Sequence, residues 1–160
     1  MARPYAIYFK KMKDDALVVD TLDNWGIVCK DFPFKLYGEA KELPSHDWKD
    51  KDGDDEYIPD VLPIAAYEME VEFAYKGDMF TANSRIKGFL DYLTGREGDG
   101  AEFMCYDTFT RIGRQKMRFV SVSEDIFHRD QNNSEYGCDV IVFSVTFKVN
   151  DPVTDITLSK

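Results

Sequence analysis

One stretch near the C-terminal end constrains the fold more than any other, Cys138–Val149, with the sequence CDVIVFSVTFKV. Apolar side chains alternate there with mostly polar ones, and the apolar set is Ile141, Phe143, Val145, Phe147 and Val149. A period of two that is rich in β-branched and aromatic residues predicts a strand. Because one face of this strand is wholly apolar, it needs a large partner surface, and we place it centrally in a sheet.

A second strand with the same period is predicted at Tyr67–Tyr75. Its glutamates, Glu68, Glu70 and Glu72, alternate with apolar residues, so the strand is half exposed and its outer face is acidic. Weaker strand candidates are Tyr5–Phe9, Ala16–Asp20, Ile27–Cys29 and Phe32–Tyr37, and a hairpin is predicted from Ala101–Thr110 and Arg114–Ser123.

One helix is predicted over Thr81–Leu93. Its apolar stripe has the spacing i, i+3, i+4 and i+7 and consists of Ile86, Phe89, Leu90 and Leu93. Thr81, Asn83 or Ser84 can supply the N-cap oxygen, and Gly95 suits the left-handed residue that follows a helix. The expected fold class is therefore α+β. It is a mostly antiparallel β-sandwich or curled sheet of about six to nine strands with one flanking helix near residues 81–94.

The totals limit the classes of function. The 160 residues suffice for a single domain over 1–160, and a net charge of −10 disfavours nucleic acid along the outer surface and anionic membranes. No apolar run approaches the roughly 20 residues of a membrane span, and we expect no signal peptide. The three widely spaced cysteines form no disulfide framework, which favours buried, reduced thiols in a cytoplasmic product.

Residues 41–63 form a long acidic loop with three prolines. It is expected to be exposed and either solvated or ordered by a partner. The loop does not match the calcium-binding loop of an EF-hand. Aligning Gly53 with the invariant glycine of that motif puts Trp48 and Pro59 where carboxylates are required. We therefore expect no metal site.

Catalytic signatures are also missing from the sequence. The two histidines, His46 and His128, are far apart and are expected to be exposed, and no serine lies in a Gly-x-Ser-x-Gly elbow. We expect no enzyme and no cofactor. An alternative is a module that binds a small ligand or carbohydrate, with aromatic platforms drawn from Tyr5, Tyr8, Trp25 and Trp48.

A basic cluster follows the predicted hairpin turn. It consists of Arg111, Arg114, Lys116 and Arg118, and the last three would share the polar face of a strand. Either it pairs with the glutamates of Glu68–Glu72, or it docks an acidic partner such as the acidic loop of another copy.

Taken together, residues 47–155 resemble the structural proteins of long-tailed bacteriophages, in the tail-tube and distal-tail group. The similar segments are the loop DWKDKDGDDEYIP, the strand YEMEVEFAY, the helix SRIKGFLDYLTG, the arginine-rich return strand RIGRQKMRFVSVS and the closing strand DVIVFSVTFKVNDP. The resemblance implies a β-sandwich or curled sheet flanked by one helix. It also implies rings, commonly six-fold, around a channel for DNA.

The resemblance further implies which partners to expect. They are other copies of the chain and other tail proteins, with DNA only passing through the channel and no membrane, so the protein would be found in the virion and in the host cytoplasm during assembly. The loop from Ser45 to Pro59 would reach a neighbouring subunit. The expected assembly contacts are Trp48, Asp50, Asp52, Asp54, Asp55, Tyr57, Arg111, Arg114, Lys116 and Arg118.

Overall fold

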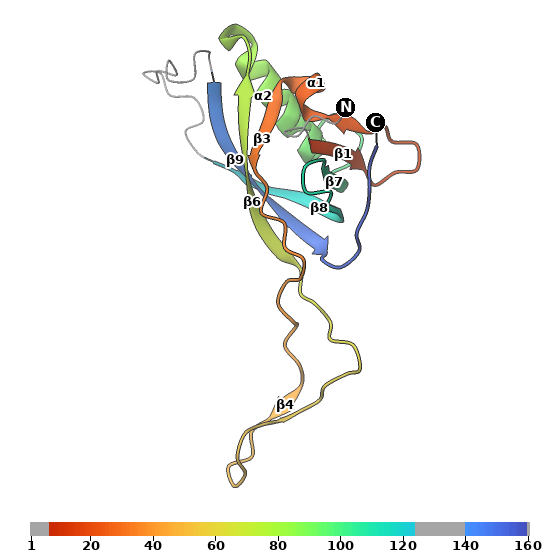
Figure 1. Ribbon diagram of the computed structural model, residues 1–160, viewed down its shortest axis with the longest axis vertical. Coiled ribbons are helices and arrows are strands. Elements are labelled where there is room, and N and C mark those ends of the chain that lie inside the picture. Colours follow the sequence, from red (N-terminus) through yellow and green to blue (C-terminus); the bar gives the residue numbers. More distant parts are fainter. Residues whose placement is uncertain (1–6, 124–139, 160) are drawn as a thin grey trace.

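Seven strands form one antiparallel sheet that curls into half a barrel, as seen in the computed structural model, which describes residues 7–123 and 140–159 (Figure 1). The strand order is β2-β1-β7-β8-β9-β6-β3, and two more strands, β4 and β5, pair separately. The elements are β1 Ile7–Lys11, β2 Val19–Asp20, α1 Thr21–Trp25, β3 Ile27–Asp31, β4 Ser45–His46, β5 Asp55–Glu56, β6 Tyr67–Lys76, α2 Met79–Thr94, β7 Phe103–Asp107, β8 Gly113–Val122 and β9 Val140–Asp151. The predicted α+β class with a curled, mostly antiparallel sheet and a flanking helix is confirmed.

The strand predicted to be central, β9, lies between β8 and β6. It pairs with β6 without interruption from Tyr67 opposite Val149 to Lys76 opposite Val140. Its five apolar residues from Ile141 to Val149 are at most 2% exposed, and the alternating glutamates of β6 point away from the core. The predicted inner and outer faces of both strands are therefore confirmed. Cys138 lies outside the described residues.

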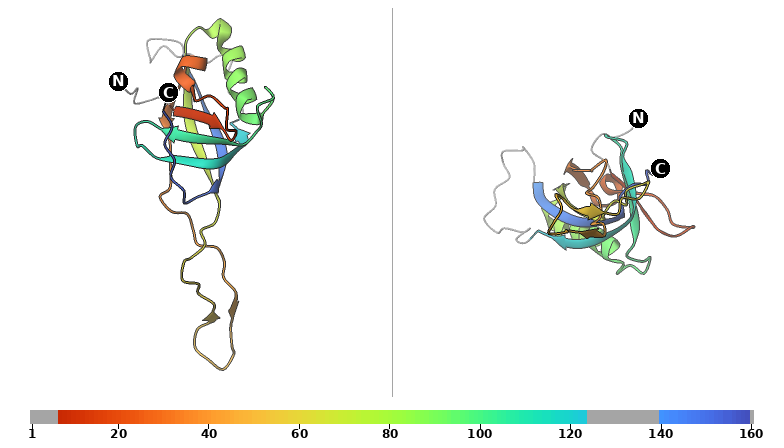
Figure 2. Two further views of the ribbon diagram at one scale, coloured as in Figure 1. Left: turned by 90° about the vertical axis from the view of Figure 1, so that its right-hand side faces the viewer. Right: turned by 90° about the horizontal axis from the view of Figure 1, so that it is seen from below.

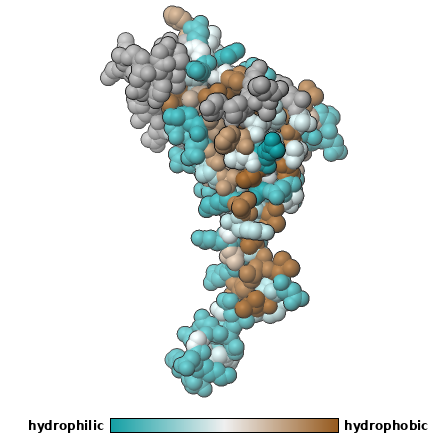
Figure 3. Space-filling model, in the orientation of Figure 1, coloured by the Kyte–Doolittle hydropathy of each residue, from teal (hydrophilic) through white to brown (hydrophobic). Residues whose placement is uncertain are grey.

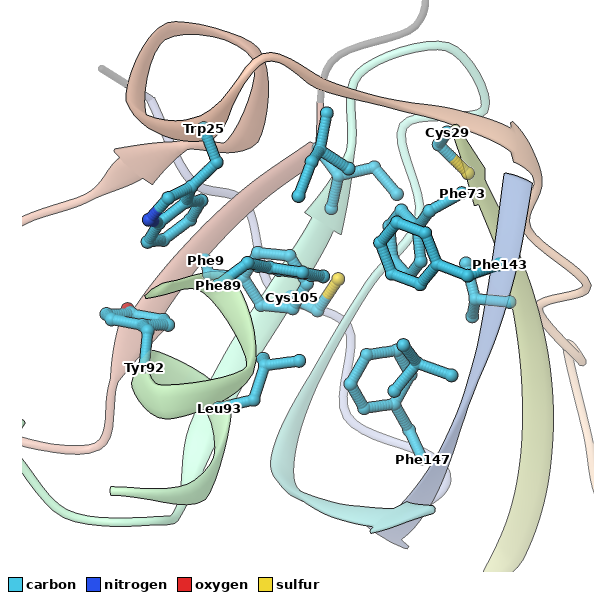
Figure 4. Packing of buried hydrophobic residues seen from close by; sticks show 14 of the residues in the cluster. Phe9, Trp25, Cys29, Phe73, Phe89, Tyr92, Leu93, Cys105, Phe143 and Phe147 are labelled. Carbon is cyan, nitrogen blue, oxygen red and sulfur yellow. The ribbon is translucent and has the colours of Figure 1, made fainter. Parts of the chain in front are cut away.

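The core lies between the concave side of the sheet and α2 (Figure 4). Phe89 of α2 contacts rings from three strands, with centroid distances of 5.9 Å to Phe9, 5.2 Å to Phe73 and 6.3 Å to Phe143. Edge-to-face pairs of this kind stabilise a core beyond the area they bury. The helix stripe that the sequence predicted faces this cluster.

The beginning of α2 corrects one prediction. The helix starts at Met79, and the side chain of Asp78 accepts a hydrogen bond from the Phe80 amide at 2.9 Å. Thr81, Asn83 and Ser84 are therefore not the N-cap. Gly95 does follow the helix with a φ of 80°, as predicted.

A second helix, α1, was not predicted. It has five residues, which are too few for a periodic pattern, and only its capping residues mark it. The Asp20 side chain accepts a hydrogen bond from the Leu22 amide at 2.9 Å, and Gly26 ends the helix with a φ of 67°. The helix connects β2 and β3, which are the two outermost strands of the sheet. It packs Trp25 against Phe89 and Tyr92, with ring centroids 5.2 and 5.4 Å apart.

The predicted strand at Phe32–Tyr37 is wrong. β3 ends at Asp31, after a register shift between Cys29 and Asp31, and the chain then leaves the sheet. Pro33 cannot donate to a ladder, and Phe32 and Phe34 instead place their rings 4.0 Å apart.

Phe73 and Phe80 provide a matched test of this core. Phe73 is fully buried among Phe89, Phe143 and Phe147, whereas Phe80 is 98% exposed. We expect Phe73→Ala to lower the free energy of unfolding by about 3–5 kcal/mol and Phe80→Ala to change it by less than about 0.5 kcal/mol, measured by urea denaturation. Equal losses in the two variants would contradict the assignment of the core.

Candidate functional site

A long arm projects from the sheet (Figures 1 and 2). We define the arm as residues 36–66, the connection between β3 and β6. Because β3 and β6 are antiparallel neighbours, this connection leaves the sheet and returns to it at the same place. The amide of Lys41 donates to the Pro63 carbonyl and that of Ala65 to the Glu39 carbonyl, each at 2.8 Å, and these bonds close its base. The predicted loop is thus an extended hairpin.

The tip of the arm, residues 45–56, is acidic and exposed. β4 and β5 pair there, and Gly53 lies in the turn with a φ of 71°. The Trp48 indole N–H donates to the Asp55 carboxylate at 3.2 Å, and the ring centroids of Trp48 and His46 are 3.9 Å apart. The whole arm has nine acidic residues and three lysines, so it accounts for −6 of the net charge of −10. No group of three or more metal-ligating side chains converges among the described residues.

The part of the arm between the sheet and the tip, which we call the stalk, exposes apolar side chains (Figure 3). The exposed fractions are 71% for Leu36, 71% for Tyr37, 68% for Tyr57, 65% for Ile58, 82% for Val61 and 46% for Leu62. Seven of the eleven large apolar side chains that the described residues leave exposed lie on the arm, counting Trp48 at the tip. Such concentrated apolar surface is typical of an interaction site.

The basic cluster is divided by a β-bulge. Cys105 pairs with Arg114 but Phe103 pairs with Met117, so β8 has one extra residue, and Lys116 adopts a φ of 53°. The bulge reverses the alternation of faces. Arg114 is therefore 1% exposed, whereas Lys116 and Arg118 remain exposed, and the prediction that all three share a polar face is wrong.

The three exposed basic residues, which we call the basic patch, are Arg111, Lys116 and Arg118. Pairing of Arg118 with Glu68–Glu72 across adjacent strands is excluded, because β9 lies between β8 and β6 and places Lys148 opposite both Glu68 and Arg118. Glu72 instead pairs with Lys30 at 3.3 Å. No ion pair joins the basic patch to another of the described residues, so its exposed charges can be met by a partner.

The aromatic residues considered for ligand stacking do not gather. Trp25 is packed in the core, Tyr8 lies near Tyr106 with ring centroids 6.5 Å apart, and Trp48 is on the arm. Tyr5 lies outside the described residues.

A cavity of about 460 Å³ opens beside Trp25 and Tyr92. The Lys11 ammonium on its wall donates to the Tyr92 and Gly100 carbonyls and lies 4.1 Å from the Tyr92 ring centroid. Burial lowers the pKa of Lys11, although Asp99 and Glu97 oppose this effect. The lysine closes the C-terminal end of α2 against the following turn, which is a structural role.

Groups that could do chemistry are dispersed. His46 is exposed on the arm, as expected, and His128 lies outside the described residues. Cys29 and Cys105 are buried, which confirms that expectation for these two thiols. Burial raises the pKa of Cys29 to about 12 and that of Cys105 well above its usual value. Neither thiol is activated as a nucleophile.

Comparison with known proteins gives no assignment, because no family model matches the sequence and no curated protein matches it. Among the described residues, neither helix has the length and apolar character needed to cross a bilayer.

Thiol labelling tests the burial of the two cysteines. In a Cys138→Ser background, we expect the native protein to react with an aromatic disulfide reagent at pH 8 at least about a hundred-fold more slowly than the urea-unfolded chain. Cys105, which is 0% exposed, should react more slowly than Cys29, which is 9% exposed. Labelling of both at the unfolded rate would contradict their burial in the core, and the rates are measured by absorbance and mass spectrometry.

Proposed function

We propose that this protein is a self-assembling structural component of a phage or prophage tail, forming rings around a channel for DNA. The observation that supports this proposal most is the arm. It places an apolar stalk and a concentrated negative charge away from the body of the molecule, where the chain's own core cannot cover them. A neighbouring copy can bury such a stalk, and burial of apolar area is the dominant favourable term in association.

Charge complementarity supports contact between copies. The acidic tip of one arm and the basic patch of another molecule have opposite charge, and both are exposed. Such pairs orient an encounter more than they strengthen it. In this proposal the stalk supplies affinity, while the tip and the basic patch define the orientation.

Strand addition would contribute less. The outer edge of β3 is the longer of the two sheet edges, but it has only five residues and ends in the exposed, charged pair Lys30–Asp31. Charged side chains and short strands discourage edge-to-edge pairing. The arm is thus the larger candidate for the contact between subunits.

The charge distribution also suits passage of DNA. In the sheet, which is separate from the arm, Glu68, Glu70 and Glu72 lie on the outer face of β6. A negative channel wall would avoid retaining the phosphate backbone, because binding to DNA requires clustered cations. The contacts between the arm of one copy and the next copy would determine which surface of each subunit faces the channel.

Removing the arm tip separates assembly from folding. We expect replacement of Trp48–Asp55 by an Asn-Gly turn to shift the melting temperature by less than about 2 °C, because the segment is outside the core. We also expect the wild type to form a concentration-dependent oligomer and this variant to stay monomeric, as measured by size-exclusion chromatography with light scattering and by negative-stain microscopy. A wild type that stays monomeric at all concentrations would refute the proposed function, and an unfolded variant would show that the tip belongs to the folding unit.

The stalk can be tested with a matched pair of variants. Val61 on the stalk and Leu17 on the body are each 82% exposed. We expect Val61→Asp to weaken assembly at least about ten-fold, because a carboxylate would be buried without a partner, and Leu17→Asp to leave it unchanged. Sedimentation velocity over a concentration series measures both, and an equal effect of the two substitutions would contradict a specific role of the stalk.

A further inference from the structure

The guanidinium of Arg114 joins three segments that are distant in the sequence. Its Nη2 donates to the Lys35 carbonyl at 3.1 Å and to the Leu36 carbonyl at 3.5 Å, at the root of the arm. Its Nη1 donates to the Gly113 carbonyl at 3.0 Å and to the carboxylate of Asp155 near the C-terminus. The Arg114 side chain is 1% exposed, so this charge is removed from water although the residues of the arm root that it holds are themselves exposed.

The carboxylate that neutralises Arg114 comes from a segment with few other attachments. We call residues 152–159 the C-terminal strap, which turns back at the end of β9 and runs past β8 (Figure 1). Asp151 makes the turn, because its side chain accepts the amides of Val153 at 3.4 Å and Thr154 at 3.2 Å. Within the strap, Pro152 and Leu158 are buried, whereas the Asp155 side chain is 80% exposed.

The strap lies against β8 at a position that only glycine allows. The Ile156 amide donates to the Gly113 carbonyl at 3.4 Å. A Cβ on Gly113 would collide with the Ile156 carbonyl oxygen and would lie 2.8 Å from its Cγ1. The strap therefore depends on two independent features of β8, the missing side chain of Gly113 and the charge of Arg114.

We propose that the C-terminal strap is a latch for the arm. While Asp155 pairs with Arg114, the guanidinium is neutralised and holds the carbonyls of Lys35 and Leu36, which fixes the arm root against β8. When the strap is displaced, the buried guanidinium has no carboxylate partner and turns toward water, because an unpaired buried charge is strongly disfavoured. The arm root is then released and the arm can change its direction.

This inference deepens the proposed function, since it rests on that function for the use of the arm in assembly. A released arm samples many directions and a latched arm presents its stalk in one. The latch itself is a property of the single chain, so it can be tested on the monomer whether or not rings form.

Hydrogen exchange followed by mass spectrometry tests the latch on the full chain at concentrations where it is monomeric. Release of the arm root is reported by the adjacent hydrogen bonds at the base of the arm, through the amides of Lys41 and Ala65. The Ile156 amide reports the strap, and the paired residues of β6 and β9 report the core. Asp155→Asn removes the carboxylate charge, and Gly113→Ala displaces the strap without altering any charge. Asp14→Asn, which removes an equal charge from an exposed loop, is the matched control.

We expect Asp155→Asn and Gly113→Ala each to accelerate exchange in the strap and at the arm root by about ten-fold or more, with core exchange unchanged. Asp155→Glu should restore slow exchange at both places, and Asp14→Asn should behave as the wild type. If Ile156 is released while Lys41 and Ala65 keep their wild-type rates, the latch is refuted. If Ile156 itself is not released in either variant, the contacts do not hold the strap and the proposal also fails. If the β6 and β9 amides lose protection in only one of the two variants, the other variant provides the test. If they lose protection in both, the contacts stabilise the whole fold and the latch is refuted.

Discussion

The uninterrupted pairing of β6 with β9 is the interaction on which the rest of the molecule depends. Ten residues of each strand pair in one register, from Tyr67 opposite Val149 to Lys76 opposite Val140. This register places Phe73 opposite Phe143 on the concave side, where Phe89 of α2 packs against both rings. A shift by one residue would turn these side chains toward water and the β6 glutamates toward the core. The same register fixes the end of β6 at which the arm joins the sheet, so the packing of the core also determines where the arm begins.

A single residue on β8 has a comparably large effect on the surface. Lys116 adopts a left-handed conformation, which is uncommon for a residue with a side chain, and the bulge it forms moves Arg114 from the outer face to the interior. Without the bulge, the strand would have a continuous basic face. With the bulge, the basic patch consists of Arg111, Lys116 and Arg118. Arg114 instead forms hydrogen bonds with both the arm root and the strap.

The features that could be predicted from the sequence are those with long, regular patterns. The alternation in Ile141–Val149 and Tyr67–Tyr75 and the helical stripe ending at Leu93 each extend over several repeats, so burial of one face determines the structure. The features that were missed depend on one or two residues. Asp20 and Gly26 define α1 through its ends alone, and nothing in the sequence marks Lys116 as a bulge. The acidic arm was predicted as an exposed segment, but its pairing was not, because its strands have no apolar face. The strap has no periodic pattern, and its position depends on Gly113 and on Arg114, which is 41 positions before Asp155.

The arm differs physically from the body of the protein, and this difference limits how the two can be coupled. The body is held by side-chain packing, which resists displacement because every ring has several neighbours. The described arm has no residue in that core. Its shape depends on a few backbone hydrogen bonds at its base and at β4 and β5, and the bonds at the base open more readily when the root is not held. Its direction must therefore depend on contacts at the root. Among these, Arg114 is a buried charge whose state depends on a carboxylate from another segment. A packed apolar contact at the same place would stiffen the root permanently, whereas an ion pair with an exposed partner can be exchanged. An arm that must meet a neighbouring molecule in one orientation benefits from a root that is fixed by a replaceable contact.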